Sequence, residues 1–226
     1  MKRYLYWIVI LCLMIGGSLF CQNNSIQFIS SFGKAKLSKD SFYSFNQNDS
    51  IQITALKFYV SNIELLNKTK TVWKDSIQYH LMDAFDEKSL QVRLPSNISF
   101  TKLKFNLGID SATNVSGAMG GDLDPTKGMY WTWQSGYINL KLEGTSTICK
   151  TRHNEFQFHL GGYQTPYNNL QTVFIEGISL PVIEVNLDIK KLISQINIAG
   201  QHHIMSPGQE ANDFSEKIIN SLSIKK

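Results

Sequence analysis

The chain has 226 residues, which is enough for one sizeable domain and too few for two ordinary ones. Its formal net charge of +4 is small, and no run of Lys or Arg interleaved with aromatic residues is present, so the pattern of a nucleic-acid-binding surface is excluded. The sequence contains no nucleophile elbow, phosphate-binding loop, dinucleotide fingerprint or His-Glu-x-x-His motif. We therefore expect that the protein is not an enzyme.

The first residues have the pattern of a secretory signal peptide. Lys2 and Arg3 precede an apolar run over residues 4–15, which is too short to cross a bilayer and is followed by a polar segment. We expect residues 1–21 to be the signal peptide, and the protein to be exported to the periplasm or cell envelope. Their removal takes away two basic residues and no acidic one, so the formal charge falls from +4 to +2.

The mature chain is predicted to be a single domain over residues 22–226. Cys21 allows two interpretations, because it is either the last residue before cleavage or a lipidated first residue that anchors the protein to a membrane. The bulky Phe20 before it favours the soluble form. Cys149 is the one cysteine that surely remains, so no internal disulfide framework is expected.

Alternating apolar and polar residues predict strands along most of the chain. The expected strands are residues 25–32, 42–45, 51–67, 76–84, 102–109, 128–134, 138–142, 154–162, 172–175 and 182–189. Within 51–67 the apolar residues change parity near Ser61 and Asn62, which predicts a β-bulge. Residues 190–198 are expected to form a short helix, and the spacing of apolar residues predicts an amphipathic helix over 209–224.

These elements predict an all-β fold. We expect a single antiparallel, immunoglobulin-like β-sandwich of roughly eight strands with a short C-terminal helix. The sequence shows no internal repeat, low-complexity tract or domain linker.

Residues 110–127 form a long link between two predicted strands, and links of this length in a compact domain are usually functional or mobile. Asp110, Asp122 and Asp124 lie in it, but the spacing of an EF-hand is absent. We expect these aspartates to form turns and hydrogen bonds to the local backbone.

The segment that follows carries two tryptophans. Strand alternation places Met129, Trp131 and Trp133 on one face, so the two indoles are expected to be neighbours. A core position and a chemical role both remain open for this pair.

Histidines are the candidate metal ligands. The chain has five: His80, His153, His159, His202 and His203. His80 and His159 lie in predicted strands on the parity opposite the local aliphatic residues, from which imidazoles of neighbouring strands could converge. Together with a thioether and carboxylates, imidazoles suit copper or zinc better than calcium. The alternative is that each is a surface or hydrogen-bonded residue.

Five blocks of the sequence together resemble the MbnP-like family of periplasmic copper-binding proteins, which is associated with methanobactin operons. They are LKFYVSNIEL (56–65), YHLMD (79–83), FNLGID (105–110), DLDPTKGMYWTWQSGY (122–137) and FQFHLGG (156–162). The resemblance runs from about Ile26 to the terminal helix, and the block with the two tryptophans is its specific part.

The resemblance implies a β-sandwich with a copper site. It also implies a partner related to di-haem cytochrome c peroxidases, which oxidises a tryptophan to kynurenine. Carried over to this sequence, Trp133 is the favoured modified residue and Trp131 the second candidate, with His80, His159 and His203 as copper ligands. Kynurenine supplies an aniline nitrogen and a carbonyl oxygen that indole lacks.

A second hypothesis remains open. The chain could be a non-metal β-sandwich module of the bacterial envelope that uses the 110–127 link and its aromatic edges as an interaction surface. An exposed apolar patch without converging histidines would favour it.

Overall fold

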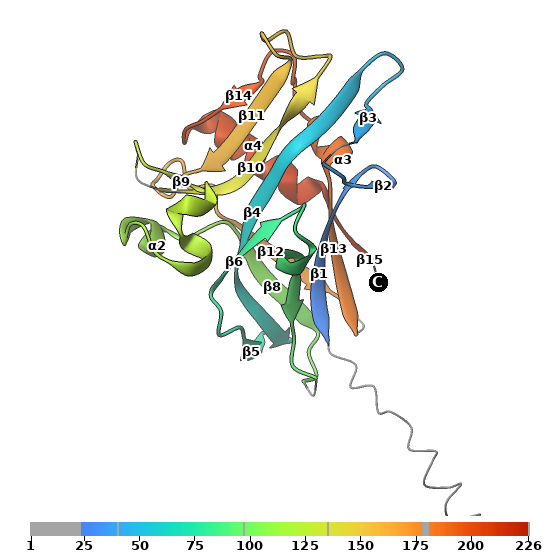
Figure 1. Ribbon diagram of the computed structural model, residues 1–226. Helices are drawn as coiled ribbons and strands as arrows, with labels where there is room; N and C mark the ends of the chain where they lie inside the picture. Colours follow the sequence, from blue (N-terminus) through green and yellow to red (C-terminus); the bar gives the residue numbers. More distant parts are fainter. Residues whose placement is uncertain (1–23, 40, 97, 135, 178–180, 226) are drawn as a thin grey trace, which may run out of the picture.

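The computed structural model describes residues 24–39, 41–96, 98–134, 136–177 and 181–225, and the predicted signal peptide and Cys21 lie outside them. Two β-sheets pack against each other with a C-terminal helix beside them, which confirms the predicted sandwich (Figure 1). Among the described residues, the helices are all too short or too polar to cross a membrane.

The larger sheet is built around one long strand, β4 (Ser50–Asn67). Five strands pair with it, so its alternating side chains set the two faces of the whole sheet. These strands are β3 (Phe42–Ser44), β5 (Lys70–Lys74), β6 (Tyr79–Asp83), β8 (Lys102–Leu107) and β10 (Gly136–Ser146). Beyond them the sheet is extended by β11 (Glu155–Gly161), β12 (Gln171–Glu176) and β14 (His203–Ile204). The predicted bulge is confirmed, because Asn62 has φ +51° and the register with β8 shifts between Ser61 and Glu64.

The smaller sheet contains the first and the last strand of the part of the chain that the structure describes. Its strands are β1 (Ser25–Phe32), β2 (Ala35–Lys36), β7 (Gln91–Arg93), β13 (Val182–Asp188) and β15 (Leu222–Lys225), and the 3₁₀ helix η1 (Glu87–Leu90) leads into β7. Here β1 lies parallel to β13, and in the larger sheet β11 lies parallel to β14. The sandwich is therefore antiparallel in most of its pairings but contains these two parallel ones.

The main core lies between the sheets. Phe28 of β1 packs edge-on against Phe58 and Phe105 of the larger sheet, with ring centroids 6.2 and 5.6 Å apart. Helix α4 (Gln209–Asn220) closes the core behind β10 and β11, and its Phe214 ring lies 4.8 Å from that of Phe158 (Figure 1).

Both predicted helices are shorter than expected. The first, α3 (Ile189–Ile193), ends after five residues. The second, α4, ends at Asn220 rather than residue 224, because Leu222–Lys225 pair with β13 as strand β15.

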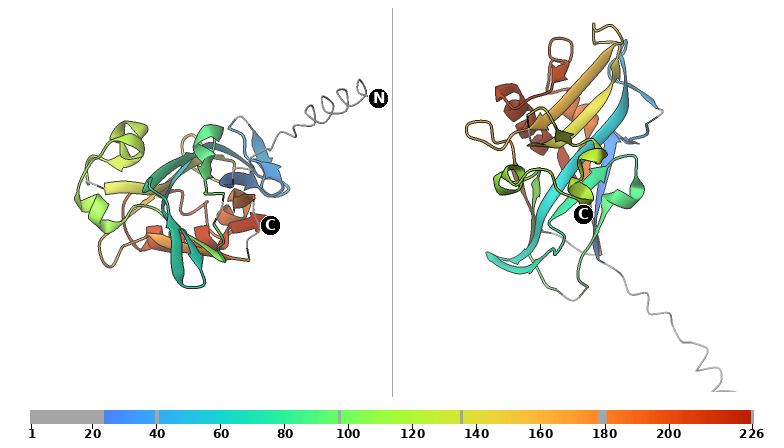
Figure 2. Two further views of the ribbon diagram at one scale, coloured as in Figure 1. Left: turned by 90° about the horizontal axis from the view of Figure 1, so that it is seen from below. Right: turned by 60° about the vertical axis from the view of Figure 1, so that its left-hand side comes forward.

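The link between β8 and β10 is folded rather than structureless. It contains α2 (Ser111–Val115), the 3₁₀ helices η2 (Gly121–Leu123) and η3 (Pro125–Lys127), and the short strand β9 (Tyr130–Trp131). The link lies on the opposite side of the molecule from the smaller sheet (Figure 2). It covers part of the outer face of the larger sheet through a second, smaller hydrophobic cluster, which we call the outer cluster. Its members are Tyr59, Leu81, Ile109, Leu123, Met129, Trp131, Tyr137 and Ile138.

The aspartates of the link have the predicted structural roles. The Asp110 carboxylate accepts a hydrogen bond from the Thr113 backbone N–H at the start of α2, and Asp124 accepts one from the Thr126 N–H at the start of η3. Asp122 accepts the Leu81 backbone N–H at 3.0 Å and so joins the link to the free edge of β6.

The pKa of Asp110 makes the attachment of the link sensitive to acid. Burial raises this pKa, but hydrogen bonds from the Tyr79 hydroxyl (2.6 Å) and from Thr113 lower it by more, so it lies below its ordinary value. The stabilisation is then fully present above the unfolded-state pKa of about 3.9 and is lost as the pH falls through the lower folded-state pKa.

We therefore expect Asp110→Asn to destabilise the protein at neutral pH, and this deficit to shrink as the pH falls below about 4. Denaturant unfolding at several pH values, followed by tryptophan fluorescence, measures it. Tyr79→Phe, which removes one donor to the carboxylate, should show a smaller effect with the same pH dependence. Equal deficits for Asp110→Asn across the acid range would contradict this account.

Candidate functional site

The indole of Trp131 lies on the outer face of the larger sheet, directly over Gly161 of β11. A Cβ atom added at Gly161 would lie 2.6 Å from Cζ3 of Trp131 and 2.5 Å from the carbonyl oxygen of Tyr137. Glycine at this position is therefore what allows the indole to approach the strand. Trp131 is only 4% exposed, and its buried Nε1 has no hydrogen-bond partner among the described residues.

Trp133 lies beside Trp131, as the alternation predicted. The two ring centroids are 6.0 Å apart and the planes are inclined by 48°. The strand is shorter than predicted, because Trp131 pairs with Gly136 at the end of a hairpin and Trp133 falls in its turn. Trp133 is consequently 63% exposed. One indole is thus a packed residue and its neighbour is open to solvent.

His159 lies two residues before Gly161 on β11, so its side chain shares the outer face with the Trp131 indole. It is largely buried, with 8% of the side chain exposed, and its Nε2 lies 2.6 Å from Oε1 of Glu143 on β10. Nζ of Lys141, which pairs directly with His159 across the strands, lies 3.4 Å from the same oxygen. The hydrogen bond from His159 lowers the pKa of Glu143 against the opposing effect of burial, and Lys141 lowers it further.

His203 lies on the next strand. In the parallel register of β14 with β11 it pairs with Gln157, so it faces the same side as His159 and lies diagonally from it. The strand spacing and the two-residue offset put their Cα atoms roughly 8 Å apart. His203 is exposed.

Sequence reasoning missed Glu143 and Met205 as members of this region. Glu143 could have been noticed as the charged residue on the polar parity of a predicted strand. Met205, which is half-buried, follows β14 by one residue, and its segment continues beside β11 because Pro207 approaches Gly162. Its signal is the spacing His-x-Met, which puts imidazole and thioether on one parity of an extended chain.

His80 lies away from this region. His80 pairs with Val60 of β4, so its strand position faces the core side of the sheet. The strand positions of Lys57, Lys141 and His159 face the outer side. Strands β6 and β11 are three spacings apart, roughly 14 Å. His80 is bound instead by Asp75, with Nε2 2.8 Å from Oδ2. The structure therefore places His159 two residues from the glycine under the Trp131 indole, and His203 on the same outer face but four residues further along β11, roughly 14 Å from that glycine. His80 lies on the opposite face of the sheet.

The remaining two histidines are also apart from the indoles. His153 is exposed in the turn before β11, and His202 precedes His203 on the opposite parity of the chain. Across the part of the chain that the structure describes, no three His, Cys, Asp or Glu side chains are grouped closely enough to hold a metal ion. Two imidazoles and a neighbouring thioether are donor types that a soft metal accepts, and on their own they make only part of a ligand set.

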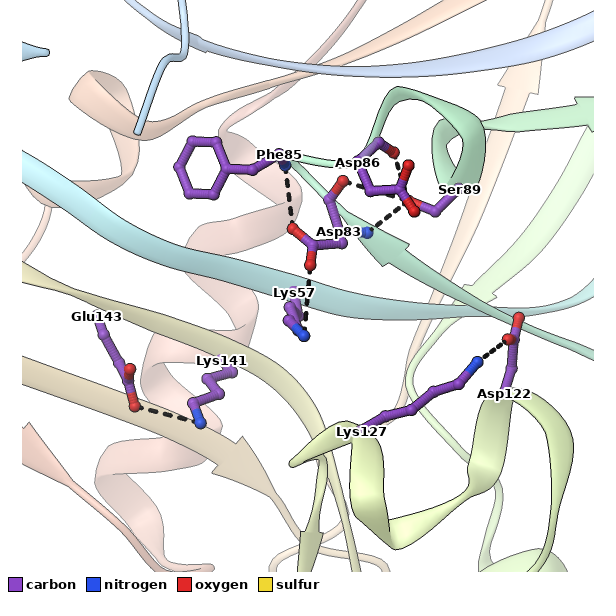
Figure 3. A network of polar contacts seen from close by, with 9 residues as sticks. All are labelled: Lys57, Asp83, Phe85, Asp86, Ser89, Asp122, Lys127, Lys141 and Glu143. Carbon is purple, nitrogen blue, oxygen red and sulfur yellow. Dashed lines mark hydrogen bonds and ion pairs between the residues drawn. The ribbon is translucent and has the colours of Figure 1, made fainter. Parts of the chain in front are cut away.

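Charged side chains cover the rest of this outer face, and they neutralise one another. Lys57 lies 3.3 Å from Asp83, Lys141 lies 3.4 Å from Glu143, and Lys127 lies 2.5 Å from Asp122 (Figure 3). Each carboxylate therefore has its own ammonium group. Such pairs do not form the concentration of free oxygen ligands that a hard cation such as calcium needs.

The fold and this region define a class: a two-sheet β-sandwich protein that carries imidazoles and an indole pair on one outer face. The sequence model of the MbnP family matches residues 22–206, and the chain belongs to that family.

Two further comparisons bear on this assignment. MbnP from Methylosinus trichosporium has a similar solved structure, with a TM-score of 0.57 and 14% sequence identity over 76% of this chain and 77% of that one. This likeness concerns the fold. No curated protein matches the sequence.

The contact between Gly161 and Trp131 yields a prediction. Gly161→Ala should destabilise the protein by about 1–3 kcal/mol, because the new methyl group has to displace either the indole or the backbone of β10. Thermal unfolding measures the loss of stability, and the tryptophan emission maximum measures the displacement of the indole.

Gly120→Ala is the matched control, because a Cβ at Gly120 has nothing within 4 Å and should leave both readings unchanged. Equal stability of the two variants would show that the indole does not rest on Gly161.

Proposed function

We propose that the protein is an exported copper-binding protein of the periplasm or cell surface and not itself an enzyme. In this proposal Trp133 is oxidised to kynurenine by a di-haem peroxidase-like partner, with Trp131 as the second candidate. The modified residue, His159 and His203 then bind copper. The observation that carries the proposal is the common outer face on which His159 and His203 lie on neighbouring strands, with the Trp131 indole over Gly161, two residues along β11 from His159, and Trp133 beside that indole.

Membership of the MbnP family supports the proposal, as does the donor chemistry. Imidazole nitrogens and a thioether sulfur are ligands that copper accepts in either of its common oxidation states. His80 is left out of the ligand set, because its strand position separates it from the indoles and Asp75 holds its ring.

The exposure of Trp133 suits it to the oxidation. Cleavage of the C2–C3 bond of the indole adds two oxygen atoms and gives N-formylkynurenine. Two molecules of hydrogen peroxide supply those atoms, accept the four electrons and leave as two molecules of water. Hydrolysis with one water then releases formate and leaves kynurenine. The solvent-exposed ring allows an external haem protein and its oxidant to reach this residue without opening the core.

Copper titration tests the ligand set. Protein purified from its native host should bind about one copper ion per chain. Loss of a residue that only supports a metal ligand weakens metal binding by roughly 10–100-fold. We expect His159→Ala and His203→Ala each to weaken copper binding by more than this.

His80→Ala is the control, because His80 is also a strand histidine hydrogen-bonded to a carboxylate, yet it lies apart from the indoles. The copper affinity of the His80→Ala variant should equal that of the unchanged protein. Absence of copper binding in both oxidation states, or a larger loss for His80→Ala than for His159→Ala, would refute this ligand set.

Mass spectrometry tests the modification. A peptide that contains both tryptophans, from protein made in the native host, should carry one residue that has gained oxygen and lost carbon. Fragmentation should place the change at Trp133, and Trp133→Phe should abolish it. An unmodified peptide from the native host would remove this half of the proposal, while a change at Trp131 would move it to the buried indole.

A second function is favoured by one observation. Val115 and Met119 of the link are exposed together with Trp133, and Tyr137 ties this segment to the hairpin through its hydroxyl, which accepts the Met119 N–H at 2.9 Å. Exposed apolar side chains on neighbouring loops are typical of an interaction surface. If the copper titration fails, we propose that the protein is an interaction module of the envelope that binds its partner here.

A further inference from the structure

We propose that Glu143 is the positioning residue for His159: its carboxylate holds the proton of the imidazole on Nε2 and thereby leaves Nδ1 as the nitrogen available to a metal. The assignment of the proton concerns the metal-free protein. Only its consequence for copper rests on the proposed function.

The geometry fixes which nitrogen is engaged. Oε1 of Glu143 lies 2.6 Å from Nε2 of His159, within the range of a charge-assisted hydrogen bond. An ionised carboxylate can only accept, and a neutral imidazole has one N–H, so the proton must lie on Nε2. No hydrogen bond to Nδ1 is found among the described residues. The unprotonated nitrogen is thus the one without a partner.

Burial makes this arrangement more than an incidental surface contact. The His159 side chain is 8% exposed and that of Glu143 is 26% exposed, so water competes little for the bond. Carboxylates that bind the remote nitrogen of a ligating histidine fix the ring orientation and raise its basicity as a ligand. The pair therefore has the form of such a supporting contact before any metal arrives.

Lys141 gives Glu143 a second role. The lysine pairs with His159 across the strands, and its ammonium group would repel a cation bound to the same imidazole. Its Nζ lies 3.4 Å from the Glu143 oxygen that also binds His159, so one carboxylate offsets the positive charge and orients the ring. Removal of the Glu143 side chain therefore removes both the compensating negative charge and the orientation of the ring. Replacement by an uncharged acceptor removes only the negative charge.

The tautomer can be observed directly. In metal-free protein with ¹⁵N-labelled histidine, at a pH where imidazoles are neutral, long-range ¹H–¹⁵N correlations should show His159 protonated on Nε2. Glu143→Ala should give a mixture of both tautomers. Glu143→Gln should keep the Nε2–H form, because its amide oxygen can still accept.

Copper affinity gives the second reading. We expect Glu143→Ala to weaken binding by about 10–100-fold, and Glu143→Gln to weaken it less. Asp75→Ala, which removes the carboxylate from His80, should leave copper affinity unchanged and is the matched control.

The positioning role of Glu143 and the proposed copper-binding function are refuted by different results. A His159 ring protonated on Nδ1 in the unchanged metal-free protein overturns the positioning role whatever copper does, and this needs no variant to fold. Tautomers in Glu143→Ala identical to those of the unchanged protein also overturn it. A fixed Nε2–H tautomer in protein that binds no copper upholds the role of Glu143 and refutes the proposed function instead.

Discussion

The structure depends on the alternation of side chains along β4, which one bulge resets near Asn62. Because side chains of one strand alternate between the faces of its sheet, the 18 residues of β4 assign every neighbouring strand an inner and an outer side. On the inner side Phe58 and Val60 belong to the main core. On the outer side Lys57 continues the charged surface and Tyr59 belongs to the outer cluster. The bulge at Asn62 restores a single core-facing side for the second half of the strand.

The candidate site lies where the outer cluster ends and the charged surface begins. Trp131 is the last packed ring of that cluster, and His159 is the next outward side chain along β11. The ion pairs on the rest of this face leave little free charge, and His159 with its partner Glu143 lies two residues along β11 from the glycine under the Trp131 indole. A buried imidazole, a covered indole and an exposed indole therefore lie close together at this boundary.

Much of the fold could be predicted from the sequence, because local alternation reports which side chains share a face. The strands of the sandwich, the bulge near Asn62 and the contact between the two indoles follow from it. The pairing of His159 with Glu143 does not, since it depends on the register between β10 and β11, which no local pattern encodes. His80 shows the same limit. Its neighbours Tyr79 and Leu81 face the outer cluster and not the main core. Their apolar character therefore suggested the wrong face of the sheet for His80.

The outer cluster has a consequence for motion. It is separated from the main core by a whole sheet and is the smaller of the two clusters. Hydrogen bonds fasten the link over it, among them the one that the Tyr59 hydroxyl donates to the Asp122 carbonyl oxygen at 3.0 Å. Regions with fewer buried contacts open locally at lower free energy than the domain as a whole. We therefore expect the link, with β9 included, to open at a lower free energy than the sandwich. Amide hydrogens between residues 108 and 134 should accordingly exchange with solvent sooner than those of β4 and β10.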